Sequence, residues 1–354
     1  MTSGKENNMH ILIIGNMGYV GSVVSHYMRN RFPDAHLSGF DSALFAHCLV
    51  SSDPVPEVVL NEQLFGDVRE LTLSTFHGVD AVIYLAAISN DPMGQQFANV
   101  TDEVNNKCCV KAAHLSEKAG VTHFVLASSC SVYGAASEVP RTEQDDVSPL
   151  TAYAKSKIAA EKKLAEMQSD RMMISCLRFA TACGFSGRLR LDLVLNDFVS
   201  AALRTGKVSV LSDGSPCRPL IDVKDMARIM EWAITRSGAG FLIVNSGVDS
   251  GNYTVKELAF AVADAIPGTQ IDINYGALPD KRSYKVDFSL LAQLAPNYLP
   301  RISLSSTIED LIAGISNSGL LRSDAGWSDL VRLRVLANFI DAGIIDKELR
   351  WIMR

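Results

Sequence analysis

Five short apolar segments, each followed by a stretch long enough to form a helix, restrict this 354-residue chain to a small group of folds. They are residues 10–15 (HILIIG), 36–41 (HLSGFD), 81–85 (AVIYL), 124–127 (FVLA) and 173–177 (MISCL). Segments of this length and composition are typical of strands that are buried on both faces. Strands that alternate with helices form parallel sheets covered by helices on both sides. The sequence therefore predicts an α/β fold with a doubly wound parallel sheet.

The regular alternation weakens after about residue 184, which predicts a second, smaller unit. This part contains a Leu-rich helix candidate at 193–204, a short strand at 208–211, a turn rich in Gly, Ser and Pro, and a helix candidate at 254–266. We expect a first domain over residues 9–185 and a C-terminal α+β lobe over residues 186–330. The apolar run 241–245 is a candidate strand that returns to the main sheet. Residues 331–354 have helical periodicity and form a predicted helical tail.

Composition excludes several classes of protein. The chain has no apolar run near the roughly 20 residues that a membrane helix needs, so we expect no membrane span. Its net charge is −6 and its Lys and Arg residues are scattered, which argues against a nucleic-acid partner. The seven cysteines are odd in number and form no C-x-x-C pair, so neither a disulfide framework nor a metal site is expected. The polar segment at residues 1–8 is expected to be a disordered tail rather than a signal peptide. The sequence therefore predicts a cytoplasmic protein with reduced thiols.

Three glycines at the first predicted strand–helix junction indicate a bound nucleotide. Gly15, Gly18 and Gly21 lie in GNMGYVG, at the end of the strand and the start of the helix. Glycines at such a junction allow a tight turn and let backbone N–H groups approach a pyrophosphate, whose charge the helix N-terminus stabilises. The spacing differs from the G-x-G-x-x-G pattern, so a glycine turn without a ligand is the alternative interpretation.

Asp41 strengthens the nucleotide interpretation, because it ends the second predicted strand 20 residues after Gly21. A carboxylate at this position accepts hydrogen bonds from an adenosine ribose and repels a 2′-phosphate. Residues 42–44 include no Lys or Arg, so NAD is expected rather than NADP. These features predict a Rossmann-type dinucleotide site. The predicted cofactor-binding residues are Gly15, Met17, Gly18, Tyr19, Val20, Gly21, Asp41, Asp67, Val68, Leu85, Ala86, Ala87, Asn105, Tyr153 and Lys157.

Tyr153 and Lys157, in YAKSK, lie four residues apart on a predicted helix and therefore share one face. A phenol whose pKa is lowered by a neighbouring ammonium is a usable base near neutral pH. The same spacing also arises by chance on exposed helices. Ser128 and Ser129 end the fourth predicted strand, at the edge of the sheet where such folds bind ligands.

The motifs GNMGYVG, GDV, LAA, SSCSVYG and YAKSK, together with Asp41 and Asn105, resemble the extended short-chain dehydrogenases/reductases that act as nucleotide-sugar epimerases and dehydratases. The resemblance covers residues 9–185. It implies an NAD-dependent enzyme with a nucleotide-diphosphate sugar as substrate, bound by the lobe at 186–330. It also implies a homodimer that pairs the helices at 105–120 and 152–168.

The resemblance implies a role for each residue that matches a family motif. Tyr153 is the expected acid/base, Lys157 holds the nicotinamide ribose and lowers the tyrosine pKa, and Ser129 hydrogen-bonds the sugar. Arg218 and Arg282 match arginines that contact the diphosphate, a role that suits a fixed charge with a fork of donors. The alternative for either arginine is a surface ion pair. The expected substrate-binding residues are Ser129, Cys130, Ser131, Thr181, Asn196, Arg218 and Arg282.

Departures from the family pattern narrow the expected chemistry. Cys130 and Ser131 stand where 4,6-dehydratases resemble one another in having Asp-Glu, which argues against a dehydratase. Thr181 stands where galactose-type epimerases have asparagine, which argues against UDP-glucose. Cys130 is interpreted as a small buried side chain, with an acid/base thiol as the alternative. The expected function is NAD-dependent epimerisation at C4 of a nucleotide-linked sugar; the alternatives are a nucleotide-4-ketosugar reductase and a non-catalytic dinucleotide sensor.

Overall fold

The structure, a computed structural model, describes residues 9–50, 54–135, 139–167, 169–238, 240–277, 283–322 and 326–352. Its centre is a seven-stranded sheet in the order β10-β6-β5-β4-β1-β2-β3, in which every neighbouring pair is parallel. The strands are β1 (His10–Ile14), β2 (His36–Asp41), β3 (Glu62–Phe65), β4 (Ala81–Tyr84), β5 (His123–Ser129), β6 (Met173–Phe179) and β10 (Phe241–Ser246). The predicted doubly wound parallel sheet is confirmed, and the run at 241–245 forms its edge strand β10. The predicted tail at residues 1–8 lies outside the described residues.

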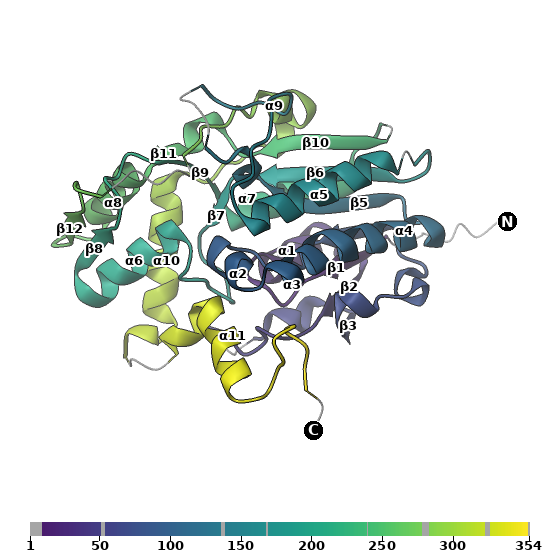
Figure 1. Cartoon of the computed structure of the whole chain (residues 1–354), viewed down its shortest axis with the longest axis horizontal. Coiled ribbons are helices and arrows are strands. Elements are labelled where there is room, and N and C mark those ends of the chain that lie inside the picture. The colour runs from purple at the N-terminus through teal and green to yellow at the C-terminus, as the bar shows by residue number, and fades with distance from the viewer. Residues whose placement is uncertain are drawn as a thin grey trace.

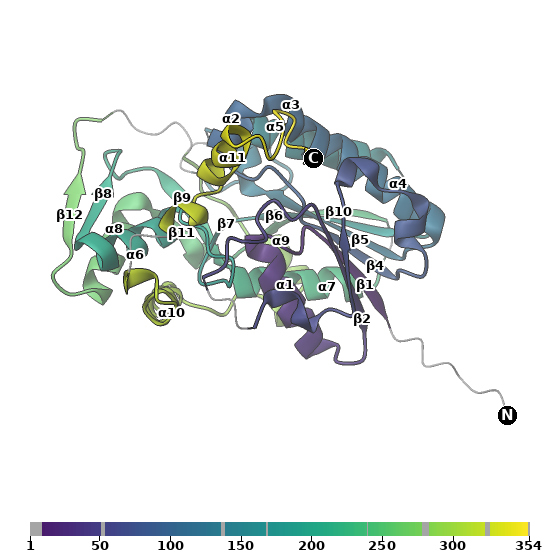
Figure 2. The ribbon, with the colours of Figure 1, turned by 90° about the horizontal axis from the view of Figure 1, so that it is seen from below.

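Helices cover both faces of the sheet because alternate strand residues point to opposite sides. Ile11 and Ile13 of β1 pack in one apolar cluster, while Leu12 and Ile14 pack in the other. Figure 2 shows α1 and α7 on one face and α4 and α5 on the other. The helices on the two faces are α1 (Tyr19–Arg31), α7 (Val223–Thr235), α2 (Asp91–Gln96), α3 (Ala98–Asp102), the π-helix η4 (Glu103–Cys108), α4 (Cys109–Ala119) and α5 (Ala152–Glu166).

The smaller lobe lies beyond the carboxyl ends of the parallel strands (Figure 1). It contains a three-stranded sheet, β11-β9-β7, and a two-stranded parallel sheet, β12-β8. Its strands are β7 (Thr181–Cys183), β8 (Lys207–Val210), β9 (Cys217–Asp222), β11 (Asn252–Thr254) and β12 (Gln270–Ile273). Its helices are α6 (Val194–Thr205), α8 (Val255–Ala265) and α10 (Leu304–Asn317), while α9 (Ser289–Leu294) packs beside the edge strand β10 of the main sheet (Figure 1). The two units interleave along the chain, since α7 and β10 belong to the main sheet although they lie between elements of the lobe.

The C-terminal segment returns from the lobe to the main domain. It consists of α11 (Arg332–Asp341) and the irregular stretch after it, and it lies beside α2 and α3 in both views (Figures 1 and 2). In the described part of the chain, no helix is long and apolar enough to span a membrane. All seven cysteines are free and buried.

Candidate active site

A cavity of about 750 Å³ lies between the carboxyl ends of the parallel strands and the smaller lobe. Parallel α/β sheets bind ligands at this edge. One end of the cavity is lined by the glycine loop, Asp41 and Asp67, and other wall residues include Arg218 and Tyr284 of the lobe region. Ser129, Tyr153 and Lys157 also line it, so the structure brings the predicted cofactor and catalytic groups into one cavity.

The glycine loop needs its glycines because it passes very close to the neighbouring strand. Gly15 has φ +92°, and a Cβ there would lie 2.6 Å from the backbone N of Ala86. The N–H groups of Leu85 and Ala86 in turn donate to Ile14 O, at 2.8 and 3.0 Å. Gly18 precedes α1, so the helix N-terminus opens toward the cavity.

Asp41 joins the end of β2 to the glycine loop. Its Oδ2 accepts from Met17 N at 3.0 Å and its Oδ1 accepts from Ala43 N at 2.8 Å. Burial raises the pKa of this carboxyl, and the two backbone hydrogen bonds oppose the rise. Arg188, which the sequence did not single out, acts on Asp41 electrostatically, but its guanidinium is paired with Glu57. Asp41 lines the cavity wall, where its carboxyl oxygens can accept hydrogen bonds from ribose hydroxyls.

The wall also contains an unpartnered polar atom. Within the described residues, Ser131 Oγ is buried and has no hydrogen-bond partner, and Ser131 lines the cavity. A buried polar atom of this kind is stabilised when a ligand supplies the partner. With the glycine loop and Asp41, it makes the cavity a good fit for a dinucleotide and a polar substrate.

Tyr153 and Lys157 project from α5, whose first turn Thr151 caps by accepting from Ala154 N. Lys157 Nζ donates to Ala127 O at 2.7 Å and lies 5.7 Å from the centre of the Tyr153 ring. Burial lowers the pKa of Lys157 to about 8. A side-chain hydrogen bond links Tyr153 to Ser129.

The predicted lowering of the tyrosine pKa by Lys157 is wrong for this structure. Burial raises the pKa of Tyr153 to about 12. The groups that oppose the rise are the Ser129 hydroxyl and the charge of Arg190, rather than the lysine. Tyr153 is therefore protonated near neutral pH, with its hydroxyl held by Ser129.

Most predicted site residues line the cavity, including Thr181 and Arg218. The guanidinium carbon of Arg218 lies 5.8 Å from the Tyr284 ring centre, and its Nη1 donates to Cys217 O at 3.0 Å. Arg282 lies outside the described residues. Four predicted residues are not in the cavity wall, namely Met17, Asn105, Cys130 and Asn196.

These four residues stabilise the cavity walls instead. Asn105 accepts from Ile88 N and donates to Ile88 O and Ser156 Oγ, at 2.9 to 3.0 Å. Asn196 accepts from Gly184 N at 3.0 Å. Cys130 Sγ donates to Arg178 O at 3.0 Å, and burial raises its thiol pKa far above the ordinary value. The geometry of Cys130 fits a buried side chain rather than an acid/base thiol.

The sequence analysis missed an ionic network in the wall. Arg190 Nη1 donates to Ser89 Oγ at 2.7 Å, and Arg190 Nε donates to Asp192 Oδ1 at 2.9 Å. Asn90 Nδ2 donates to the other oxygen of Asp192 at 2.6 Å. The available signal was a pair of charges, Arg190 and Asp192, inside the otherwise apolar run LRLDLVL.

Comparisons with known proteins identify the family of this chain and agree with its fold. The model of the NAD dependent epimerase/dehydratase family matches residues 11–247. A UDP-glucose 4-epimerase of Azospirillum brasilense is 25% identical over 305 residues, which cover 79% of this chain and 85% of the relative. One of Bacillus subtilis is 25% identical over 300 residues, covering 75% and 85%.

Solved structures share the same fold. A UDP-glucose-4-epimerase of Stenotrophomonas maltophila, with bound NAD and formylated UDP-arabinopyranose, has a TM-score of 0.76 at 21% identity and covers 88% of this chain and 98% of its own. The NAD-dependent NDP-hexosamine 5,6-dehydratase TunA has the same TM-score at 20% identity and the same coverage. The chain belongs to the NAD dependent epimerase/dehydratase family, within the extended short-chain dehydrogenases/reductases. NAD is its cofactor.

Proposed function

We propose that this protein is an NAD-dependent epimerase that inverts C4 of a nucleotide-diphosphate sugar. The observation that carries the proposal is the convergence of Ser129, Tyr153 and Lys157 in a cavity that also contains the glycine loop and Arg218. Cys130 and Ser131 supply neither of the carboxyl groups that an Asp-Glu dehydratase uses. The relatives named UDP-glucose 4-epimerase support the reaction class, while Thr181 argues for a sugar other than glucose.

Tyr153 exchanges the proton that the reaction requires. In its phenolate form Tyr153 takes the proton from the C4 oxygen in the first half-reaction, and the phenol so formed returns it in the second. Ser129 orients the same sugar oxygen through its hydroxyl, which already pairs with Tyr153. Arg190 stabilises the phenolate by its positive charge. NAD, which the glycine loop and Asp41 would hold, would supply the hydride acceptor and donor for C4.

Arg218 holds the substrate through its diphosphate while the sugar turns. Its position in the wall, beside the Tyr284 ring, lets the guanidinium form charge-assisted hydrogen bonds to phosphate oxygens. A substrate held at this end can rotate its 4-keto sugar and present the opposite face to the hydride donor. Because the hydride and the proton are both returned, the cycle needs no external reductant.

A nucleotide-4-ketosugar reductase is the second candidate. The raised pKa of Tyr153 favours it, since a protonated phenol is ready to donate to a reduced carbonyl. The two functions differ in whether reducing equivalents are consumed.

The deciding experiment incubates the purified protein with a panel of nucleotide-sugars and no added reductant. Proton NMR then follows the configuration at C4. Interconversion of two C4 epimers, without net change in NADH, is expected. Stoichiometric NADH oxidation with a 4-keto substrate, and no epimerisation of any saturated sugar in the panel, would support the reductase instead.

The quaternary and cellular context belong to the same proposal. The helices α4 (Cys109–Ala119) and α5 (Ala152–Glu166) lie on one face of the sheet and form the proposed homodimer surface (Figure 2). Light scattering is expected to give twice the mass of 38.4 kDa. The free, buried cysteines fit a reducing, cytoplasmic compartment.

A further inference from the structure

The C-terminal segment, residues 332–352, forms part of the wall of the cofactor cavity. Arg332, from the first turn of α11, and Leu349, near the end of the described chain, both line the cavity. They share this wall with Asp41 and Asp67, the carboxylates at its predicted adenosine end. Neither residue stood out in the sequence, because the tail is far from every nucleotide motif.

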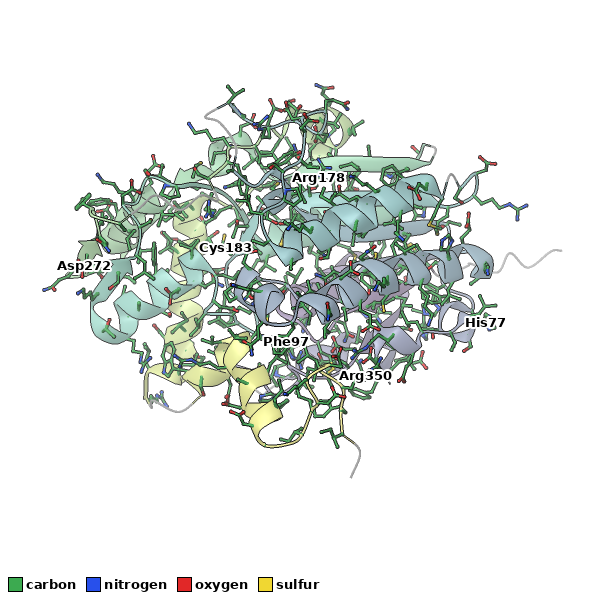
Figure 3. All side chains as sticks on the ribbon, viewed as in Figure 1. His77, Phe97, Arg178, Cys183, Asp272 and Arg350 are labelled. Atoms are coloured by element: carbon green, nitrogen blue, oxygen red, sulfur yellow. The ribbon has the colours of Figure 1, made fainter. Side chains whose placement is uncertain are left out.

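An apolar cluster seats the segment on the main domain. Leu336, Ile345 and Leu349 are each at most 3% exposed, and they pack with residues of the cofactor half that include Leu44 and Phe97. Figure 3 labels Phe97, on the helices that the segment covers, and Arg350, on the segment itself. Burial of this extent indicates a fixed contact rather than a loose tail.

Polar contacts tie the segment to the two chain regions that carry the nucleotide carboxylates. Trp351 Nε1 donates to Ser42 O at 2.6 Å, directly after Asp41. Arg69, which is ion-paired with Asp67, also donates to Glu348 O at 2.8 Å. The segment thus bridges β2 and the turn after β3 across the mouth of the adenosine end.

The backbone at Leu349 is held in a conformation that leucine rarely adopts. Its φ is +57°. Asp346 Oδ1 fixes the surrounding turn by accepting from Glu348 N and Arg350 N, both at 2.9 Å. Such a residue persists only where its surroundings hold it, and it is often functional. Here the strained turn points the leucine side chain into the cavity wall.

The comparisons are consistent with an added element. The matched regions include 97–99% of each solved relative but only 86–88% of this chain. The chain therefore has residues beyond the shared fold.

We propose that residues 332–352 are a cover over the adenosine half of bound NAD, which must lift before the cofactor can leave. The cover keeps NAD in place between catalytic cycles. The inference rests on NAD binding in this cavity and not on which sugar is epimerised. Retention suits a redox-neutral cycle, in which each hydride that leaves the substrate must return from the same cofactor molecule.

The test measures the rate of NAD release from the purified, NAD-loaded protein, by dilution into an excess of a dehydrogenase that consumes free NAD. The double variant Arg350→Ala/Trp351→Ala removes surface contacts, including the ring contact of Trp351 with Phe339, and leaves the buried residues of the apolar cluster in place. Losing a hydrogen bond and two weak ion pairs should accelerate release about threefold or more. Leu349→Gly removes the buried side chain and relieves the positive φ, and it should accelerate release by at least about tenfold.

Ile352→Ala is the matched control, because Ile352 lies in the same segment but is 46% exposed and lies outside the apolar cluster. Its release rate should equal that of the wild type. Hydrogen exchange gives a second readout: amides at 343–352 should be better protected in the NAD-loaded protein than in the stripped one. Unchanged release in both folded variants, or equal protection in the two states, would overturn the cover. Faster release together with failed epimerisation would reject the proposed function and leave the cover standing.

Discussion

At the scale of single residues, burial acts in opposite directions on the two catalytic groups. It raises the pKa of Tyr153 to about 12 and lowers that of Lys157 to about 8. Both shifts have one cause, since a buried site disfavours the charged form of either group. At neutral pH the phenol is therefore mostly protonated, so the first half-reaction needs its minor phenolate form, while the lysine is mostly charged and loses its charge near pH 8.

Tyr153→Phe deletes the exchangeable proton with little change in packing. Loss of general acid–base catalysis typically lowers a rate by ~10²–10⁴, so turnover should fall by that order while NAD content and nucleotide-sugar affinity remain. Steady-state kinetics and a binding titration check this. Turnover within tenfold of the wild type would remove Tyr153 from the chemical step.

The lowered pKa of Lys157 predicts a falling limb in the pH profile of kcat centred near pH 8 rather than near 10.5, because the ammonium is lost there. The same pKa shift has the opposite effect on stability. The unfolded chain binds the proton up to about pH 10.5 and the folded chain only to about pH 8, so between these values the lysine's contribution to the free energy of unfolding rises with pH.

Lys157→Met supplies the control for this stability effect. Denaturant unfolding of both proteins should show that the free energy of unfolding of the wild type rises relative to that of the variant between about pH 8 and pH 10.5. A kcat that stays flat to pH 10, or a stability difference that does not change with pH, contradicts the assignment.

At the scale of elements, the π-helix η4 shows what the sequence could and could not predict. Apolar periodicity predicts a helix over 105–120, and the end at Gly120, with φ +89°, agrees with the structure. The wide turn over Glu103–Cys108 depends on tertiary contacts, because it places Asn105 between Ile88 and Ser156. A pattern of apolar residues contains no information about that bridge.

Asn105→Ala should lower the free energy of unfolding by roughly 1–3 kcal/mol, because it leaves the buried N–H and C=O of Ile88 unpaired. Urea unfolding measures the loss. Asn99→Ala is the control, since Asn99 is exposed on the adjacent helix α3 and should change stability by less than about 0.5 kcal/mol. Equal effects of the two substitutions would show that the Asn105 bridge contributes nothing specific.

At the scale of the whole molecule, local patterns predicted the sheet and the cofactor end of the cavity. The glycine loop, Asp41 and the YAKSK pair are each readable within a few residues, and they meet because parallel strands end at the same edge. Other wall residues, among them Arg190, Tyr284, Arg332 and Leu349, are brought to that edge only by the packing of the lobe and the tail. Sequence spacing does not encode such contacts.

NAD and the substrate diphosphate are expected at different ends of the cavity, so a substitution at one end should change the affinity for one ligand and not for the other. Arg218→Ala should weaken affinity for a nucleoside diphosphate by about 10- to 150-fold, the equivalent of 1.5–3 kcal/mol for a charge-assisted hydrogen bond. NAD affinity should not change, because the glycine loop and Asp41 are untouched. Calorimetric titrations of both ligands check this, and an unchanged diphosphate affinity would place that group elsewhere.

The central claim, that a hydride leaves C4 and returns to C4, is tested most directly with a nucleotide-sugar carrying deuterium at C4. The sugar that reacts in the panel is incubated with the wild-type protein and no added NAD or NADH, and the position of the label is followed by NMR. We expect both C4 epimers to form with the deuterium still on C4. Deuterium found at another carbon of the sugar, or lost from C4 without epimer formation, would contradict the account.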